Sequence, residues 1–201
     1  MAVAANADMT VTFDVPAGFT LVPYASDTAQ HMFPKADMVL QPNKDYVAVL
    51  DTDAGRIVID LLEAQTPITV NSFVFLALHH YFDGIAFHRV VDQFVAQGGD
   101  PNSLDPDSST WGSGGPGYSF GLEIVGTLKY DRAGVVGMAR TMDPNSNGSQ
   151  FFITLAAASN LNGQYTIFGK VIEGLDVLPS IVRGEPPDSP TRMKRVYIAV
   201  K

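Results

Sequence analysis

The strongest constraint on the fold of this chain is the repeated alternation between short apolar runs and turn residues that begins at Tyr46. Runs of about four to eight residues rich in β-branched and aromatic side chains are typical of strands, and Gly, Pro, Asn and Asp between them mark turns. The 201 residues include 18 Gly and 13 Pro, which supplies enough turn chemistry for many short strands. Many short strands with few helices favour a β-sandwich or a closed barrel.

The expected strands follow from these runs. Residues 46–52 and 56–61 alternate in character and flank Asp53-Ala54-Gly55, a pattern that predicts a hairpin. Further short strands are expected at 86–90, 94–97, 133–139, 151–154, 165–171 and 196–200.

Two segments have helical character. Thr66-Pro67 is a typical helix start, and the apolar residues that follow recur at helical spacing, which predicts an amphipathic helix with one buried face that ends by Asp83-Gly84. Residues 173–182 form a second candidate helix, which Pro179 would shorten or kink because proline lacks a backbone N–H.

Residues 1–45 differ from the rest, because their short apolar alternations are broken by several Pro and Gly residues. We expect an extended or partly ordered N-terminal extension, followed by one domain over residues 46–201. Phe13, Phe19, Leu21 and Tyr24 are expected to pack on that domain.

The start of the chain and its hydropathy bear on location. Ala5-Asn6-Ala7 resembles the end of a signal-peptide cleavage site, although a loose Ala-rich start is the simpler interpretation. We therefore expect a cytoplasmic protein, with export after removal of a signal peptide as the alternative. No run of 18 apolar residues is present, so no membrane association is expected.

Charge and cysteine content exclude several functions. The net charge of −8 argues against a general nucleic-acid binder and against attachment to anionic membranes. The absence of Cys excludes disulfides, thiolate nucleophiles and Cys-ligated zinc. No His or carboxylate cluster has metal-ligand spacing, so we expect no metal.

Two segments carry the candidate chemistry, residues 87–101 and residues 137–154. Alternate residues of a strand share a face, so Gln97 lies with Val95, and Phe152 lies with Gln150. Arg89 would bring a cation beside these side chains. An apolar pocket with a few polar groups is the usual composition of a small binding site.

At these residues the sequence resembles the cyclophilin-type peptidyl-prolyl cis-trans isomerases. The resemblance rests on FHRVVDQFVAQGGDP from Phe87, on GSQFFIT from Gly148 and on LNGQYTIFGKV from Leu161, which occur in the family's order, and it extends over residues 46–201. It implies a mainly β fold, a closed eight-stranded antiparallel barrel capped by two α-helices, with the substrate on the outer surface. It also implies rotation about X-Pro peptide bonds, which assists protein folding.

The resemblance implies the site residues as well. Arg89 and Gln97 would be catalytic, and Gly112-Ser113-Gly114-Gly115 would border a neighbouring subsite. The substrate-binding residues would be Phe94, Val95, Ala139, Arg140, Gln150, Phe152, Leu161 and Tyr165. The implied partners are proline-containing polypeptides, the protein would act as a monomer, and the reaction would need no cofactor.

Departures from the family pattern point to a bacterial-like member. Asn160 stands where many eukaryotic members have Trp, Tyr165 stands where they have His, and Arg140-Thr141 lies beside one additional residue. A proline-peptide-binding module or chaperone on the same fold, with incidental turnover, is the alternative function, and a scaffold that recruits a partner through residues 1–45 is a weaker one. The complete set Arg89, Phe94, Gln97 and Phe152 favours the enzyme, and deletion of residues 1–40 is expected to leave most of its activity.

Overall fold

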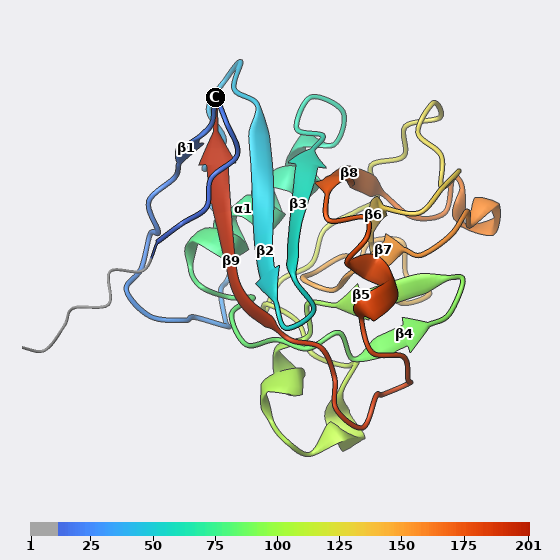
Figure 1. Ribbon diagram of the computed structural model, residues 1–201. Coiled ribbons are helices and arrows are strands. Elements are labelled where there is room, and N and C mark those ends of the chain that lie inside the picture. The colour runs from blue at the N-terminus through green and yellow to red at the C-terminus, as the bar shows by residue number, and fades with distance from the viewer. Residues whose placement is uncertain (1–11) are drawn as a thin grey trace, which may run out of the picture.

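A computed structural model describes residues 12–201, in which nine strands form one antiparallel sheet with the order β1-β9-β2-β3-β8-β6-β7-β5-β4 (Figure 1). The Ala5-Asn6-Ala7 pattern lies outside the described residues. The strands are β1 (Thr20–Leu21), β2 (Tyr46–Thr52), β3 (Arg56–Leu61), β4 (Arg89–Val91), β5 (Val95–Gly98), β6 (Val135–Met138), β7 (Phe151–Thr154), β8 (Ile167–Glu173) and β9 (Met193–Val200).

The mainly β antiparallel fold predicted from the sequence is confirmed, and two details differ. The terminal strands of the order, β1 and β4, are not paired with each other, so hydrogen bonds do not close the sheet. Residues 12–201 contain one α-helix, α1 (Pro67–Leu78). The expected second helix at 173–182 is instead the end of β8 followed by a single 3-10 turn at Leu178–Ser180, where Pro179 takes an early position that needs no backbone N–H.

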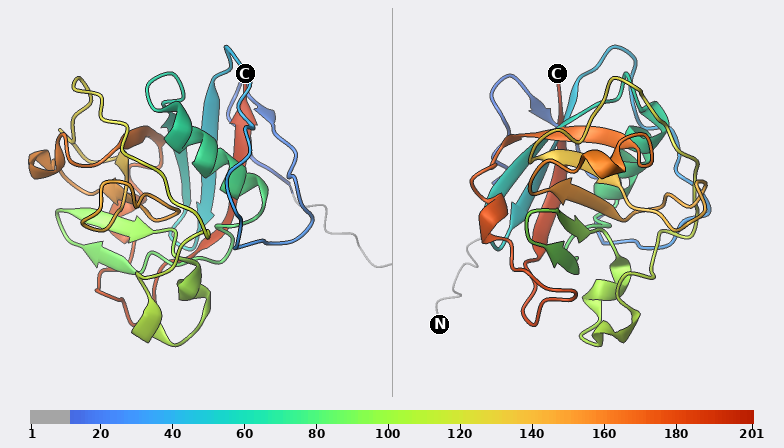
Figure 2. Two further views of the ribbon diagram at one scale, coloured as in Figure 1. Left: turned by 180° about the vertical axis from the view of Figure 1, so that it is seen from behind. Right: turned by 90° about the vertical axis from the view of Figure 1, so that its right-hand side faces the viewer.

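Helix α1 begins after Thr66 with proline in its first turn, as the sequence predicts. The expectation of one buried face is wrong, because residues 69–78 are all buried. One side of α1 packs behind the sheet formed by β9, β2 and β3 (Figures 1 and 2). The other side is covered by the N-terminal extension, where the Asn71 side chain binds the backbone of residues 37–40 and the Phe33 ring meets the Phe75 ring edge-on.

The extension also covers the outer face of the β2–β3–β9 sheet. Strand β1 pairs with the end of β9, and the Tyr24 hydroxyl donates to the Val196 carbonyl at 3.0 Å. The predicted packing of four aromatic and apolar side chains on the domain is confirmed. Phe13, Phe19, Leu21 and Tyr24, together with Val15, contact a buried cluster of Val47, Val49, Val58, Tyr197 and Ala199.

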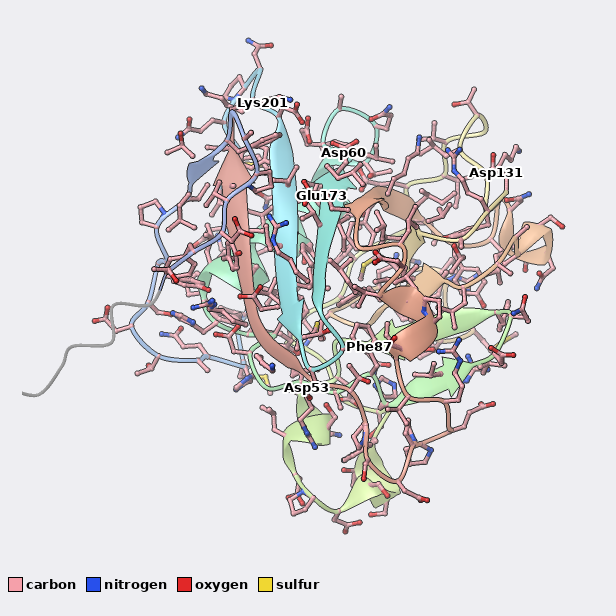
Figure 3. All side chains as sticks on the ribbon, in the orientation of Figure 1. Asp53, Asp60, Phe87, Asp131, Glu173 and Lys201 are labelled. Carbon is pink, nitrogen blue, oxygen red and sulfur yellow. The ribbon has the colours of Figure 1, made fainter. Side chains whose placement is uncertain are left out.

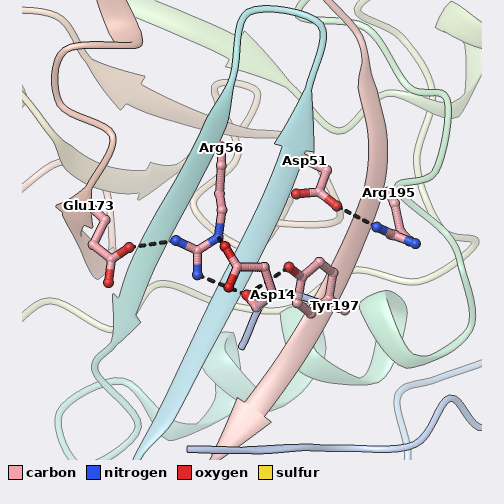
Figure 4. Close-up of polar contacts among 6 residues, drawn as sticks. All are labelled: Asp14, Asp51, Arg56, Glu173, Arg195 and Tyr197. Atoms are coloured by element: carbon pink, nitrogen blue, oxygen red, sulfur yellow. Dashed lines mark hydrogen bonds and ion pairs between the residues drawn. The ribbon is translucent and has the colours of Figure 1, made fainter. Parts of the chain in front are cut away.

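Polar contacts fix the start of this covering segment. The Asp14 carbonyl accepts hydrogen bonds from the Arg56 guanidinium and from the Tyr197 hydroxyl, at 2.9 and 3.0 Å (Figure 4). Arg56 also pairs with Glu173 on β8. The extension is therefore tied to β3 and β9, and the Arg56 side chain that binds it is itself held by β8.

The middle of the β2–β3 hairpin is buried and its ends carry charge. In Figure 3, Asp53 in the turn and Asp60 on β3 lie at opposite ends of the hairpin.

The opposite part of the sheet, made of β4, β5, β6 and β7, presents the residues of the candidate site (Figure 1). None of the described helices is long and apolar enough to cross a membrane.

Candidate active site

A row of directly paired residues crosses four neighbouring strands at the candidate site. Arg89 on β4 pairs with Gln97 on β5, Gln97 pairs with Phe152 on β7, and Phe152 pairs with Gly137 on β6. Residues that are directly opposite in antiparallel strands present their side chains on the same face. The sheet therefore places a cation, an amide and an aromatic ring side by side on its outer surface.

Gly137 is the fourth residue of this row, and a residue with a side chain would not fit there. A Cβ atom at Gly137 would lie 2.7 Å from Cζ of Phe152 and 2.1 Å from the Tyr130 hydroxyl. The Phe152 ring thus lies over the bare backbone of β6, and the fully buried Tyr130 supports it at a centroid distance of 5.6 Å.

The row borders a pocket of about 120 Å³. It is lined by Arg89, Phe94, Val95, Gln97, Ala139, Arg140, Phe152, Leu161 and Tyr165. All nine were singled out from the sequence, and the tenth residue, Gln150, lines an adjoining pocket.

The floor of the small pocket is a hydrophobic cluster distinct from the main interior of the fold. Its buried members are Leu62, Val95, Tyr130, Val135, Phe152, Ala158, Leu161 and Ile167. Phe94, Ala139 and Tyr165 pack against it while partly exposed. Apolar strand residues are usually interior, but here the outer face of the sheet is apolar as well and contains a pocket.

A chain of amide hydrogen bonds links the row to residues 112–117, the glycine-rich loop. Gln97 donates to Gln150 Oε1 at 3.0 Å, and Gln150 in turn donates to the carbonyls of Gly112 and Gly114, each at 2.9 Å. The buried carboxylate of Asp100 accepts from the Gly112 amide on the other side. Two residues therefore hold this loop in place, Asp100 just after β5 and Gln150 just before β7. The sequence resemblance predicts that the same loop borders a neighbouring subsite.

Arg140 and Tyr165 form the opposite rim. The guanidinium of Arg140 lies 4.8 Å from the Tyr165 ring centroid and donates to the Gln164 carbonyl at 2.8 and 3.1 Å. Stacking and two parallel donors fix the planar guanidinium, an arrangement that lysine could not reproduce.

Sequence reasoning missed Glu185. Its carboxylate accepts a hydrogen bond from Nε of Arg89 at 2.9 Å. Glu185 lies in an irregular loop that the Gly184–Val90 backbone hydrogen bonds hold against β4. No local pattern marks a residue 96 positions away from its partner, so only the fold could reveal the contact.

His88 lies behind this surface and is buried. Burial lowers the pKa of His88 below its usual value, an effect that the nearby Asp100 carboxylate opposes in part. A buried neutral imidazole suits a structural role beneath the site.

The adjoining pocket is larger, with a volume of about 780 Å³. Residues 112–119 form one wall, and residues 139–141, 146 and 148–150 form the other. Gln97, Ala139 and Arg140 line both pockets, so the two lie side by side. Met32 from the N-terminal extension also lines the larger pocket, which sequence reasoning did not anticipate.

Together these features can bind an extended peptide and act on it without a covalent step. The small pocket offers apolar surface to one compact side chain, and Arg89 and Gln97 offer hydrogen-bond donors to the backbone beside it. Among residues 12–201 no group of three or more His, Asp or Glu side chains is arranged to hold a metal ion.

Comparison with known proteins agrees with this geometry. Residues 47–200 match the family model described as cyclophilin type peptidyl-prolyl cis-trans isomerase/CLD. The peptidyl-prolyl cis-trans isomerase ppi1 of Schizosaccharomyces pombe is 40% identical over 156 residues, which cover 75% of this chain and 96% of the relative. CYP18-1 of Arabidopsis thaliana, a peptidyl-prolyl cis-trans isomerase, is 39% identical over 74% of this chain and 93% of its own length. These eukaryotic relatives give no support to a bacterial-like subgroup.

Other relatives are longer or known in three dimensions. The spliceosome-associated protein CWC27 homolog of Danio rerio is 41% identical over 66% of this chain, but this match spans 27% of that protein. A crystal structure of a Cryptosporidium parvum cyclophilin type peptidyl-prolyl cis-trans isomerase, determined in the presence of the dipeptide Ala-Pro, superposes with a TM-score of 0.69. It is 34% identical and covers 76% of this chain and 98% of its own.

Proposed function

Because the chain belongs to the cyclophilin-type peptidyl-prolyl cis-trans isomerase family, it catalyses rotation about X-Pro peptide bonds, and we propose that Arg89 is the residue that lowers the barrier. The observation that carries this proposal is the position of Arg89 on the rim of the small apolar pocket, in one row with Gln97 and Phe152.

The chemistry follows from the twisted state of the bond. Rotation costs about 18–20 kcal/mol because it breaks amide resonance, and the nitrogen regains a lone pair as the bond twists. An Nη–H group of Arg89 can donate a hydrogen bond to that nitrogen, which is a much better acceptor in the twisted state than in either planar state. Such differential binding lowers the barrier.

The other pocket residues hold the substrate in this mechanism. Phe94, Val95, Phe152 and Leu161 would surround the proline ring, since these four side chains form the apolar part of the pocket. The Gln97 amide would hold the carbonyl that precedes proline. Glu185 accepts from Nε and leaves the two Nη groups of Arg89 for the substrate.

The test is exchange spectroscopy on an Ala-Pro peptide. Arg89→Ala should lower kcat/KM about ten- to hundred-fold, since a charged hydrogen bond contributes ~1.5–3 kcal/mol. Arg89→Lys should recover only part of the loss, because lysine lacks the fork geometry. Normal turnover by a folded Arg89→Ala variant would exclude Arg89 as the catalytic residue and favour the alternative of a proline-peptide-binding module.

The natural setting is part of the proposal. We expect proline-containing polypeptides as partners, action as a monomer in the cytoplasm, and no binding of nucleic acid, for which the net charge of −8 gives the physical reason. The name of the Danio rerio relative suggests a second setting, association with the spliceosome. Cell fractionation and size-exclusion chromatography of the full chain test location and oligomeric state.

A further inference from the structure

One residue that lines the larger pocket lies outside the family domain. Met32 belongs to the N-terminal extension, whereas the family model begins at residue 47. The remaining lining residues lie between 97 and 150. This chain therefore adds a side chain of its own to the pocket beside its active site.

The position of Met32 is fixed by its neighbours on both sides. The Gln30 amide donates to the His79 carbonyl at 3.1 Å, and the Phe33 amide donates to the Pro116 carbonyl at 2.8 Å. The Phe33 ring is buried against Phe75 and His79, at centroid distances of 4.9 and 5.1 Å. The backbone on both sides of Met32 is thus held between the end of α1 and the glycine-rich loop.

The loop makes room for Met32. Gly117 has a φ of +93°, and a Cβ atom there would lie 2.4 Å from the Met32 sulfur and 2.7 Å from the Phe33 carbonyl oxygen. A residue with a side chain would be strained at this φ and would collide with the extension. The close contact places the thioether against the loop at the pocket rim.

The Met32 side chain nevertheless remains accessible, with 73% of its surface exposed. A flexible, polarisable thioether adapts to apolar partners of different shape. The two pockets share Gln97, Ala139 and Arg140, so a peptide with proline in the small pocket can continue into the large one. Because an extended chain advances about 3.3–3.6 Å per residue, side chains two or three positions from proline lie ~7–11 Å further along it, and these are the side chains we expect in the large pocket.

We propose that Met32 determines substrate specificity, by forming an apolar wall for a substrate side chain two or three residues from the proline. The occupant is a large apolar side chain such as Leu. This inference rests on the isomerase activity and concerns the choice among proline-containing substrates, with the extension as the part of the chain that makes the choice.

The test uses pairs of Ala-Pro peptides that differ only in Leu or Ser, placed two or three positions before or after the proline. If Met32 covers ~30–60 Å² of apolar surface, the wild type should prefer Leu at one of these positions by about three- to tenfold in kcat/KM. Met32→Ala should lose that preference, because kcat/KM falls for the Leu peptide and stays the same for the Ser peptide. Met32→Glu should lower activity on the Leu peptide further.

Met38→Ala is the matched control, because Met38 is a methionine of the same extension with 75% exposure that does not line the pocket. It should keep the wild-type preference. An unchanged preference in Met32→Ala, or an equal loss on Leu and Ser peptides, would overturn the proposal. Wild-type turnover of the Ser peptide measures isomerase activity independently, so loss of specificity and loss of function are distinguished.

Discussion

The carboxylate of Glu185 lies 2.9 Å from Nε of Arg89, at the edge of the pocket where the substrate bond would rotate. The two side chains are 38% and 54% exposed, so water screens the pair and its contribution to folding is small. Its effect on orientation is more specific. A hydrogen bond through Nε restrains the guanidinium from turning about its stem, which favours one direction for its Nη groups.

Glu185→Gln should therefore reduce turnover more than stability. Exposed ion pairs contribute ~0.2–1 kcal/mol, which corresponds to a decrease in kcat/KM of at most about fivefold. The melting temperature should stay close to that of the wild type. Exchange spectroscopy at low and high salt measures the effect, which should shrink as salt screens the wild-type pair.

The matched control for this prediction is Asp92→Asn, which breaks an exposed ion pair with Arg183 at 3.2 Å in the same region. Neither Asp92 nor Arg183 lines the small pocket, so turnover should not change. Equal effects of the two substitutions would show that Glu185 contributes only general surface charge. An increase in turnover in Glu185→Gln would instead show that its carboxylate competes with the substrate.

Gly137→Ala should damage the pocket by overpacking, without removing any polar side chain that lines it. The added Cβ would lie 2.7 Å from the Phe152 ring and 2.1 Å from the Tyr130 hydroxyl, so both rings must move. Overpacking of this kind costs about 1–3 kcal/mol in stability. We expect a lower melting temperature and a raised KM for proline peptides. An unchanged KM would mean that the position of the Phe152 ring does not shape the pocket.

The pocket residues could be predicted from the sequence because they lie in three contiguous segments, residues 87–101, 137–154 and 161–171, which carry the motifs that resemble the family. Arg89 and Gln97 belong to two strands joined by a short turn, and alternation assigns the outward residues on each. The β2–β3 hairpin and β7 begin and end where the apolar runs predict. In each of these cases, local chemistry and the final fold agree.

The features that the sequence did not reveal depend on contacts between distant segments. Residues 69–78 follow a helical apolar pattern, but the pattern could not show that residues 25–40 cover the outer side of α1. Met32 lines the larger pocket and Glu185 binds Arg89, and both come from irregular segments at opposite ends of the chain. Irregular segments carry no periodicity from which a facing direction can be derived.

Two histidines, the buried His88 and the half-buried His31, should make stability depend on pH. Burial lowers the pKa of His88 and of His31 in the folded protein, whereas the unfolded chain titrates near the ordinary value of about 6.5. Above that pH the two histidines are neutral in both the folded and the unfolded state, so they do not lower the free energy of unfolding. As pH falls below about 6.5, the unfolded state binds protons first, so the free energy of unfolding decreases.

Urea unfolding at pH 7.5 and pH 5.5 measures this effect. Each histidine changes the free energy of unfolding by at most ~1.4 kcal/mol per pH unit. His88→Gln should remove the contribution of His88 to this pH dependence. The difference between the two pH values is the readout, so a general loss of stability in the variant does not affect the conclusion. An identical pH dependence in wild type and variant would show that His88 does not titrate differently on folding.

Removal of the extension provides the sharpest test of where the domain begins. The sequence alone leads to the expectation that deletion of residues 1–40 leaves most activity, but the contacts of the extension lead to a different one. The deletion would expose the cluster around Val47, Val49 and Tyr197 and the outer side of α1. Each large side chain that loses full burial costs ~1.5–3 kcal/mol, so a few of them amount to a large part of the ~5–15 kcal/mol that stabilises a domain.

We therefore expect the protein without residues 1–40 to melt at a much lower temperature and to aggregate through the exposed face of β2, β3 and β9. Deletion of residues 1–11 is the control, since it keeps every contact described from Asp14 onward. Asn71→Ala is a milder variant, which removes the side chain that binds residues 37–40 and should lower the melting temperature in the same direction. If the longer deletion melts like the full chain, the extension is an appendage and the folding unit begins near Tyr46. If it melts early while the shorter one does not, residues 12–45 are part of the domain.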